Sequence, residues 1–131
     1  METARIIYDG CRLDVPIMPD GKPLHIPYDG FAHWQGTYCG PGKFGDMIVP
    51  DDLFGVPINI ACFIHDHSNA LAETTEEDHM SNVMFRENMF AILRHLEPRP
   101  EWKDKFHYAR WHRAILYYEA VDTCGLRRDV V

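Results

Sequence analysis

The sequence predicts a mainly α-helical single domain over residues 1–131, in which a turn-rich N-terminal third precedes a core of three helices, two of them long and antiparallel. Prolines and glycines are concentrated in the first half of the chain, whereas apolar residues recur at helical spacing in the second half. Hydrophobic residues make up 46% and charged residues 25% of the chain, the balance of a folded globular protein. A chain of 131 residues can bury a core of its own.

Residues 1–35 are expected to form turns and a small β-hairpin. Pro and Gly punctuate this segment at positions 16, 19, 21, 23 and 27. Asp20-Gly21 is a favoured two-residue hairpin turn, and it separates the short stretches Cys11–Ile17 and Lys22–Ile26. The sequence therefore predicts that these two stretches pair with each other.

A glycine-rich loop is expected over residues 36–56. Gly40 and Gly42 are spaced by one residue, and glycine adopts backbone angles that let successive carbonyl oxygens turn towards one point. Carbonyl oxygens with one bidentate carboxylate can hold Ca²⁺, with water completing the shell. Taken alone, the segment Tyr38–Gly42 is explained equally simply as a tight turn.

Three helices are predicted over residues 57–125. The first covers residues 57–72, with Pro57 in its first turn. The second covers residues 75–96, after a capping-box pattern, Thr74-x-x-Glu77, and before Pro98. The third covers residues 100–124 and ends at Gly125.

The first two helices should be antiparallel neighbours, because only a few residues connect them. Folding the chain about position 73 places His65 level with about position 81 of the second helix. Asp78 and Asn82, one turn apart on the same face, are therefore the polar residues expected to face His65.

The net charge of −7 limits the possible partners. Nucleic acid is not expected, because affinity for it comes mainly from Lys and Arg that neutralise phosphates. Strongly anionic membranes should also repel the chain, whereas a divalent cation suits it; the acidity is equally explained as an aid to solubility. No apolar run of about 18 residues and no secretory signal is visible, which predicts a cytoplasmic protein or a component of a larger particle.

His65 and Asp66 are the first candidates for chemistry. Histidine titrates near neutral pH and can take a proton from water, which makes His65 a candidate general base. Asp66 projects about 100° further around the helix, so it is free to face another partner such as a metal ion. The alternative is that both are polar surface residues of an amphipathic helix.

The two features together resemble the secreted phospholipase A2 family. The resemblance is carried by Tyr38-Cys39-Gly40-Pro41-Gly42, followed by Cys62-x-x-His65-Asp66. It implies hydrolysis of the sn-2 ester of phospholipids at a membrane surface, with His65 as general base, and a disulfide between Cys39 and Cys62. The implied Ca²⁺ ligands are the Asp66 carboxylate and the carbonyl oxygens of Tyr38, Gly40 and Gly42.

A second resemblance, to short uncharacterised phage and bacterial proteins, covers Val49 to Gly125. Their pattern runs A-x-x-x-H-D, then A-D-x-x-F-R-x-x-M, then A-V-x-x-x-G. Here the matching segments are Ala61 to Asp66, Ser81 to Met89 and Ala120 to Gly125. Both resemblances imply a single phospholipase A2-like fold, and the second implies a phage-related protein carried in the particle or the cytoplasm.

Two positions depart from the family patterns. Asn69 stands where both families have tyrosine, and Asn82 stands where an acid steadies the histidine. An amide can orient an imidazole but cannot stabilise its cation as a carboxylate does. Asp78 and, more weakly, Asp122 are candidates to replace that acid. A catalytically silent binding or structural protein on the same fold is therefore the main alternative to a hydrolase.

Three further interpretations remain open. A transition-metal site could use Cys39, Cys62, His65 and His67, and Cys62 could act as a thiol nucleophile beside His65. An acyl channel could be lined by aromatic and aliphatic residues, although core packing explains most of them better. These residues are Phe31, Trp34, Phe44, Phe54 and Ile58.

Overall fold

The computed structural model describes residues 1–31, 52–97 and 106–125, with side chains up to residue 123. Within these residues the chain forms three helices and two small antiparallel sheets of two strands each, which confirms a mainly α fold with a small β-hairpin. None of the described helices is long and apolar enough to cross a membrane. The elements are β1 (Thr3–Tyr8), β2 (Cys11–Pro16), β3 (Asp52–Leu53), β4 (Val56–Pro57), α1 (Asn59–Leu71), α2 (Thr75–Leu96) and α3 (His107–Gly125).

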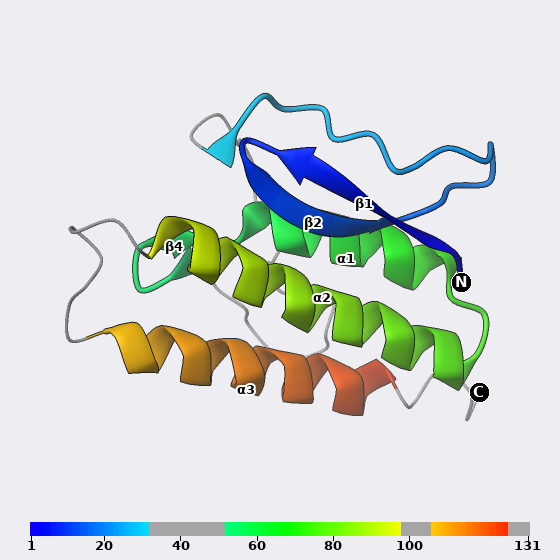
Figure 1. The fold of residues 1–131 in the computed structure, drawn as a ribbon. Coiled ribbons are helices and arrows are strands. Elements are labelled where there is room, and N and C mark those ends of the chain that lie inside the picture. Colours follow the sequence, from blue (N-terminus) through cyan, green and yellow to red (C-terminus); the bar gives the residue numbers. More distant parts are fainter. Residues whose placement is uncertain (32–51, 98–105, 126–131) are drawn as a thin grey trace.

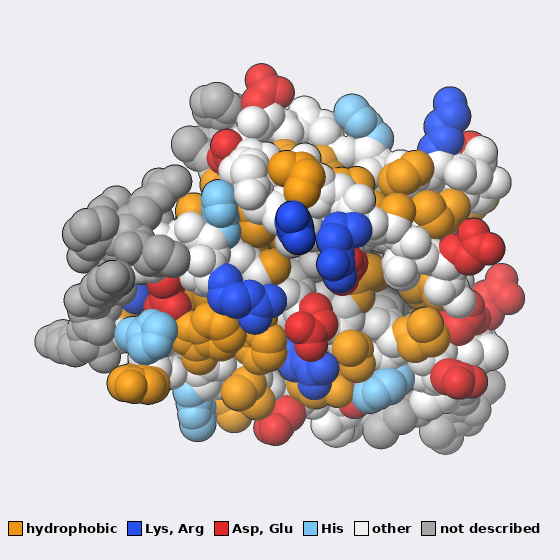
Figure 2. All heavy atoms as spheres, viewed as in Figure 1, with side chains coloured by type: hydrophobic (Ala, Val, Ile, Leu, Met, Phe, Trp, Pro, Cys, Tyr) orange, Lys and Arg blue, Asp and Glu red, His pale blue; other side chains and the backbone are white. Residues whose placement is uncertain are grey.

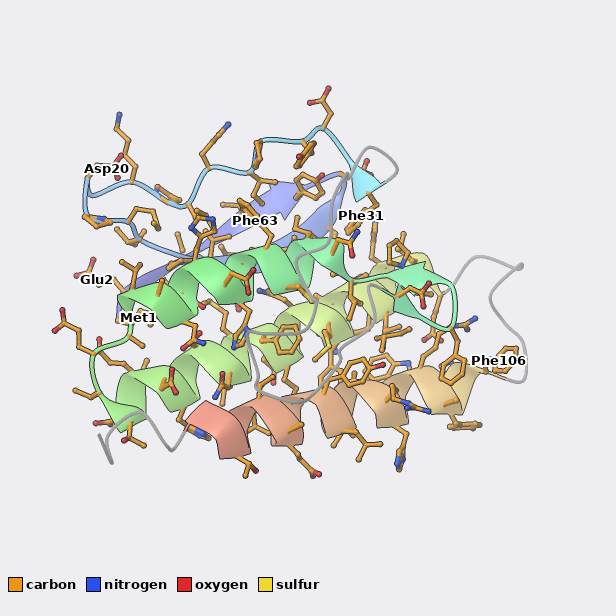
Figure 3. The ribbon with its side chains drawn as sticks, turned by 180° about the vertical axis from the view of Figure 1, so that it is seen from behind. Met1, Glu2, Asp20, Phe31, Phe63 and Phe106 are labelled. Atoms are coloured by element: carbon orange, nitrogen blue, oxygen red, sulfur yellow. The ribbon has the colours of Figure 1, made fainter. Side chains whose placement is uncertain are left out.

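Helix α2 lies at the centre of the fold (Figure 1). Helix α3 runs along one side of α2, α1 lies along another, and the β1–β2 hairpin lies over α1 and α2. The view from behind shows α1 beside α2, with the strands above it and Phe106 at the start of α3 (Figure 3). The buried apolar residues of these elements form one cluster, so the described parts share a single core.

The predicted pairing of Cys11–Ile17 with Lys22–Ile26 is confirmed only as one bridge, between Ile17 and Pro23. Strand β2 begins at Cys11 as predicted, but it pairs with the preceding strand β1, from Thr3 opposite Pro16 to Tyr8 opposite Cys11. The turn is Asp9-Gly10, whose φ angles of 48° and 81° are those that a tight two-residue hairpin requires. Asp20-Gly21 does lie in a turn, but it supports only a single bridge, because the prolines that flank it cannot donate to a ladder.

Asn88 of α2 attaches the β1–β2 hairpin to the helices. Its side-chain amide accepts a hydrogen bond from Asp14 N and donates one to Asp14 O, each at 2.9 Å. These two bonds satisfy backbone groups on the edge of β2 that faces away from β1. Strand β2 also alternates its burial, so that Cys11, Leu13 and Val15 all point into the core.

The boundaries of α2 agree closely with the sequence prediction, whereas α1 and α3 both begin later than predicted, α3 at His107 rather than at residue 100. Helix α1 begins at Asn59 rather than at Pro57, because Pro57 belongs to β4 of a short second hairpin. That hairpin occupies the end of the predicted loop over residues 36–56 and turns at Phe54-Gly55, with φ angles of 48° and 94°. Helix α2 covers the predicted residues, and the Thr74 side chain accepts from Glu77 N at 3.1 Å as its cap.

A buried ion pair joins the end of α2, the start of α3 and the second hairpin. Arg110 is 1% exposed and Glu97 is 5% exposed, and their side chains are 3.3 Å apart. Arg110 also donates to the carbonyl oxygens of Leu53 and Phe54, at 3.2 and 3.0 Å, while Trp111 Nε1 donates to Glu97 at 2.6 Å. The N–H groups of the Arg110 guanidinium therefore tie the second hairpin to α3 through hydrogen bonds to backbone carbonyl oxygens.

We predict that Arg110→Met lowers the free energy of unfolding by about 3–5 kcal/mol, because it keeps most of the side-chain volume but removes the buried cation that pairs with Glu97 and the donor to two carbonyl oxygens. Urea denaturation followed by far-UV circular dichroism measures the loss. Arg5→Met is the matched control, because the Arg5–Asp14 pair is largely exposed and should change stability by less than about 1 kcal/mol. Equal losses in the two variants would contradict this account of Arg110.

Candidate functional site

A buried hydrogen bond between α1 and α2 forms the centre of the candidate site. The His65 ring is 1% exposed, and its Nε2 lies 2.7 Å from Asn82 Oδ1. The hydrogen bond places position 65 level with the predicted part of α2, and α1 and α2 run antiparallel (Figure 1). Of the two residues expected opposite His65, Asn82 is therefore the one that contacts Nε2.

The surroundings of Asn82 determine which way its amide points. Its Nδ2 donates to Asp122 Oδ1 at 3.0 Å and lies 3.5 Å from the Val121 carbonyl oxygen. Both of these groups are acceptors, so the NH₂ end of the amide must face α3 and the oxygen must face His65. His65 then carries its proton on Nε2, and Nδ1 is the nitrogen of the neutral ring that can accept a proton.

The chain of hydrogen bonds continues from Asp122 to the surface. His79 Nδ1 lies 2.9 Å from Asp122 Oδ1 and 3.1 Å from Oδ2. The His79 side chain is 49% exposed and that of Asp122 is 23% exposed. Four side chains from three helices thus form one path, from the buried ring of His65 through Asn82 and Asp122 to His79 in solvent.

The His65 ring is held by aromatic packing, and a second polar contact between α1 and α2 lies nearby. Phe85 of α2 stacks on the ring at 4.7 Å between centroids, with 26° between the planes. One turn further along α1, Ser68 Oγ lies 2.5 Å from Ser81 Oγ and donates to the His65 carbonyl oxygen at 3.2 Å. The α1–α2 interface therefore contains a polar strip within an otherwise apolar core.

The two aspartates of the predicted site are close in sequence to residues of this strip. Asp66 is half-buried, with its Oδ1 atom shielded from solvent, and it follows His65 on α1. Asp78 is 2% exposed and lies one turn before Asn82 on α2. Asp78 is thus buried, as a functional carboxylate could be, but Asn82 occupies the position at His65 Nε2.

Only one of the predicted Ca²⁺ ligands is in the described part of the chain. Tyr38, Gly40 and Gly42 lie outside the described residues. Asp66 fits a hard cation, because it supplies a half-buried carboxylate next to His65. Among the described side chains, no group of three or more His, Cys, Asp or Glu residues is arranged to hold a metal ion.

Cys62 is disulfide-bonded, which corrects two of the alternative interpretations. A sulfur in a disulfide has no thiolate, so in this state Cys62 is neither a nucleophile nor a transition-metal ligand. Cys11 is free and buried, and burial raises the pKa of its thiol to about 11. The bonding partner of Cys62 is not among the described side chains, and Cys39, which the family resemblance implies, lies outside the described residues.

The described residues among the acyl-channel candidates make packing contacts, which is the interpretation that the sequence favoured for most of them. Ile58 is fully buried in the core, Phe54 stacks on Phe106 at 5.2 Å, and Phe31 packs edge-on against Tyr8 at 5.4 Å. These side chains make separate packing contacts on different elements. Trp34 and Phe44 lie outside the described residues.

His65 lines neither of two cavities that open on the described surface. The larger, of about 540 Å³, lies between β2 and α2 and includes Arg12, Arg94 and His95 in its wall. Figure 2 shows Lys and Arg side chains gathered on this face, over the hairpin and α2. The smaller, of about 240 Å³, is mainly apolar and has His79 at its edge.

The sequence did not predict the roles of His79 and of the Asn82–Asp122 contact. His79 is three residues before Asn82, so helical spacing alone places both on one face of α2. The sequence offers Asp122 only as a candidate for the acid that contacts His65 directly. Its place behind Asn82 depends on how α3 is aligned with α2, which the spacing within either helix does not determine.

Neither a protein-family model, nor a curated protein, nor a solved structure matches this chain. The two family resemblances therefore remain predictions. The function is best inferred from the geometry around His65.

Proposed function

We propose that the protein hydrolyses the sn-2 ester of phospholipids, with His65 as general base and Ca²⁺ bound at Asp66 and the glycine-rich loop. The observation that carries the proposal is the hydrogen bond from His65 Nε2 to Asn82. A general base needs one ring nitrogen held by a fixed acceptor, so that the other can take a proton. The bond to Asn82 meets this requirement and directs the basic role to Nδ1.

In the proposed reaction, His65 Nδ1 takes a proton from a water molecule as the water oxygen attacks the ester carbonyl carbon. His65 Nε2 keeps its proton and its bond to Asn82 Oδ1, so the ring does not rotate as it becomes charged. Nδ1 then gives the proton to the departing alkoxide, and the products are a lysophospholipid and a fatty acid. Because the ring is 1% exposed, substrate binding must make it accessible.

Ca²⁺ would be held by Asp66 together with the carbonyl oxygens of Tyr38, Gly40 and Gly42. When bound, it would act as a Lewis acid on the ester carbonyl and as a template for the phosphate. The support from the described residues is the carboxylate of Asp66, which follows His65 directly on α1 and is half-buried.

The second candidate is a catalytically silent binding or structural protein on the same fold, of phage origin. Two observations favour it: the His65 ring is buried, and its Nε2 partner is an amide rather than a carboxylate. An imidazolium held only by a neutral amide is less stable than one held by an acid, which raises the barrier to proton transfer. The two candidates share the fold and differ in turnover.

We predict that the protein hydrolyses phosphatidylcholine vesicles in the presence of Ca²⁺, and that His65→Gln lowers the rate by about 100-fold or more. Zwitterionic vesicles avoid the repulsion that an acidic protein meets at an anionic surface. Fatty acid release measured by mass spectrometry, with sn-1 and sn-2 chains of different length, also tests the position of attack.

The matched control is His67→Gln, the same substitution two residues further along α1, where the ring contacts Phe63. It should leave the rate within a few fold of wild type. Wild-type rates in His65→Gln would exclude His65 as the base. A wild-type protein that binds Ca²⁺ and vesicles without releasing fatty acid would establish the silent alternative.

Calcium binding is tested separately by thermal unfolding. A ligand at 100 times its Kd stabilises the folded state by about 2.7 kcal/mol, so millimolar Ca²⁺ should raise the Tm by several degrees. Asp66→Asn should abolish the rise, because it removes the one charged ligand, whereas Glu119→Gln on the exposed part of α3 should preserve it. An unchanged Tm in millimolar Ca²⁺ would exclude Ca²⁺ binding from both the hydrolase and the silent alternative.

We predict that Cys39 is the residue bonded to Cys62. Peptide mapping of the unreduced protein should recover these two cysteines in one linked fragment. Cys39→Ser should free the Cys62 thiol and lower stability by about 2–5 kcal/mol, whereas Cys124→Ser should leave the bond intact. A fragment that links Cys62 to Cys124 would contradict the family resemblance at this point.

A further inference from the structure

We propose that Asp122 is the acid of the His65 site, acting through Asn82 as a positioning residue. In this arrangement the carboxylate lies one side chain further from the histidine than in a direct pair. The inference deepens the proposed function, since it assigns the group that orients the base. Its test, however, reads the state of the His65 ring and does not depend on turnover.

The three side chains form a continuous relay of hydrogen bonds. His65 Nε2 and Asn82 Oδ1 are 2.7 Å apart, and Asn82 Nδ2 and Asp122 Oδ1 are 3.0 Å apart. Asn82 is 2% exposed, so water does not compete at the middle of the relay. The same amide therefore accepts from the ring and donates to the carboxylate.

An amide in this position transmits part of the effect of the carboxylate. A hydrogen bond from Nδ2 to an anion draws electron density towards the amide oxygen, and hydrogen bonds in a chain strengthen one another. Asn82 Oδ1 becomes a better acceptor for the His65 Nε2 proton than an isolated amide would be. Asp122 is also the nearer of the two acceptors that hold the amide in one orientation, the other being the Val121 carbonyl oxygen, and this orientation fixes the tautomer of the ring.

The geometry also explains why Asn, rather than Asp, occupies position 82. A carboxylate there would face that of Asp122 across the 3.0 Å that now separates Asn82 Nδ2 from Asp122 Oδ1. Two carboxylates this close cannot both be ionised without a large electrostatic penalty. With Asp at 122, an amide at 82 satisfies both neighbours and leaves one negative charge in the relay.

His79 provides the internal control. It contacts both oxygens of Asp122 from the solvent side, at 2.9 and 3.1 Å, but it does not lie between Asp122 and Asn82. If Asp122 acts through Asn82, removing His79 should leave the tautomer of His65 unchanged. If Asp122 only ties α3 to α2, His79→Ala and Asp122→Ala should both keep the His65 tautomer. The two variants would then differ only in stability.

The first measurement is the tautomer of His65, by ¹⁵N NMR of the full chain at a pH where the ring is neutral. The wild type and His79→Ala should show the proton on Nε2. Asp122→Ala should show a mixture, with at least a several-fold gain in the form that carries the proton on Nδ1, because the amide of Asn82 can then turn over. An unchanged tautomer in a folded Asp122→Ala variant would overturn the inference.

The second measurement exchanges the two side chains and stays informative if Asp122→Ala fails to fold. Asn82→Asp alone should lower the Tm, because it places two carboxylates in contact. Adding Asp122→Asn should recover most of the loss and keep the proton on Nε2, because one amide and one acid are present again. If the double variant is as unstable as the sum of the single ones, the relay is refuted.

These outcomes are separate from those of the proposed function. The protein could show the expected tautomer and side-chain exchange results without hydrolytic activity. That outcome would support the relay and exclude the proposed reaction. Alternatively, the wild type could hydrolyse phospholipid through His65 while the His65 tautomer stays unchanged in Asp122→Ala. That outcome would support the reaction and exclude the relay.

Discussion

The buried hydrogen bond between His65 and Asn82 is the constraint on which the site and the helix pairing both depend. Two polar groups that are almost fully buried must meet, because leaving either one without a partner in the core would cost about 1–3 kcal/mol. Apolar contacts are non-directional and therefore specify the alignment of α1 along α2 less sharply than a hydrogen bond does. Together with the Ser68–Ser81 contact, the bond favours one alignment of the two helices.

Buried polar side chains bond α2 to its neighbouring elements along its whole length. Asn82 joins it to α1 and α3, Asn88 joins it to the edge of β2, and Glu97, just after its end, binds Arg110 and Trp111 of α3. Each of these side chains is at most 5% exposed. The apolar core supplies most of the stabilisation, and these buried polar residues determine which element packs against which part of the helix.

The sequence predicted features that depend on local patterns and missed those that depend on alignment between distant elements. Thr74 was identified as a cap and the limits of α2 were correct, because capping and helical spacing act within a few residues. The opposition of His65 and Asn82 also followed from a short connection. The main partner of β2 was predicted incorrectly, because an Asp-Gly turn lies on each side of it and either neighbouring segment could pair with it. The preceding segment, β1, pairs because it contains no proline, whereas the following segment contains Pro23. Asp122 behind Asn82 required the packing of α3, which no local pattern encodes.

A His–Asn–Asp relay is a costly way to hold helices together. Well-packed apolar residues of similar size usually stabilise a helix interface as well as, or better than, buried polar groups. Asn88 and Glu97 have evident structural partners in backbone edges and in a buried cation. His65 differs from them, because its partner Asn82 fixes the tautomer of a ring that can change its protonation state near neutral pH. Places where a fold departs from the most stable choice are expected to be functional sites. That expectation favours a chemical role for Nδ1 of His65 over a purely structural one.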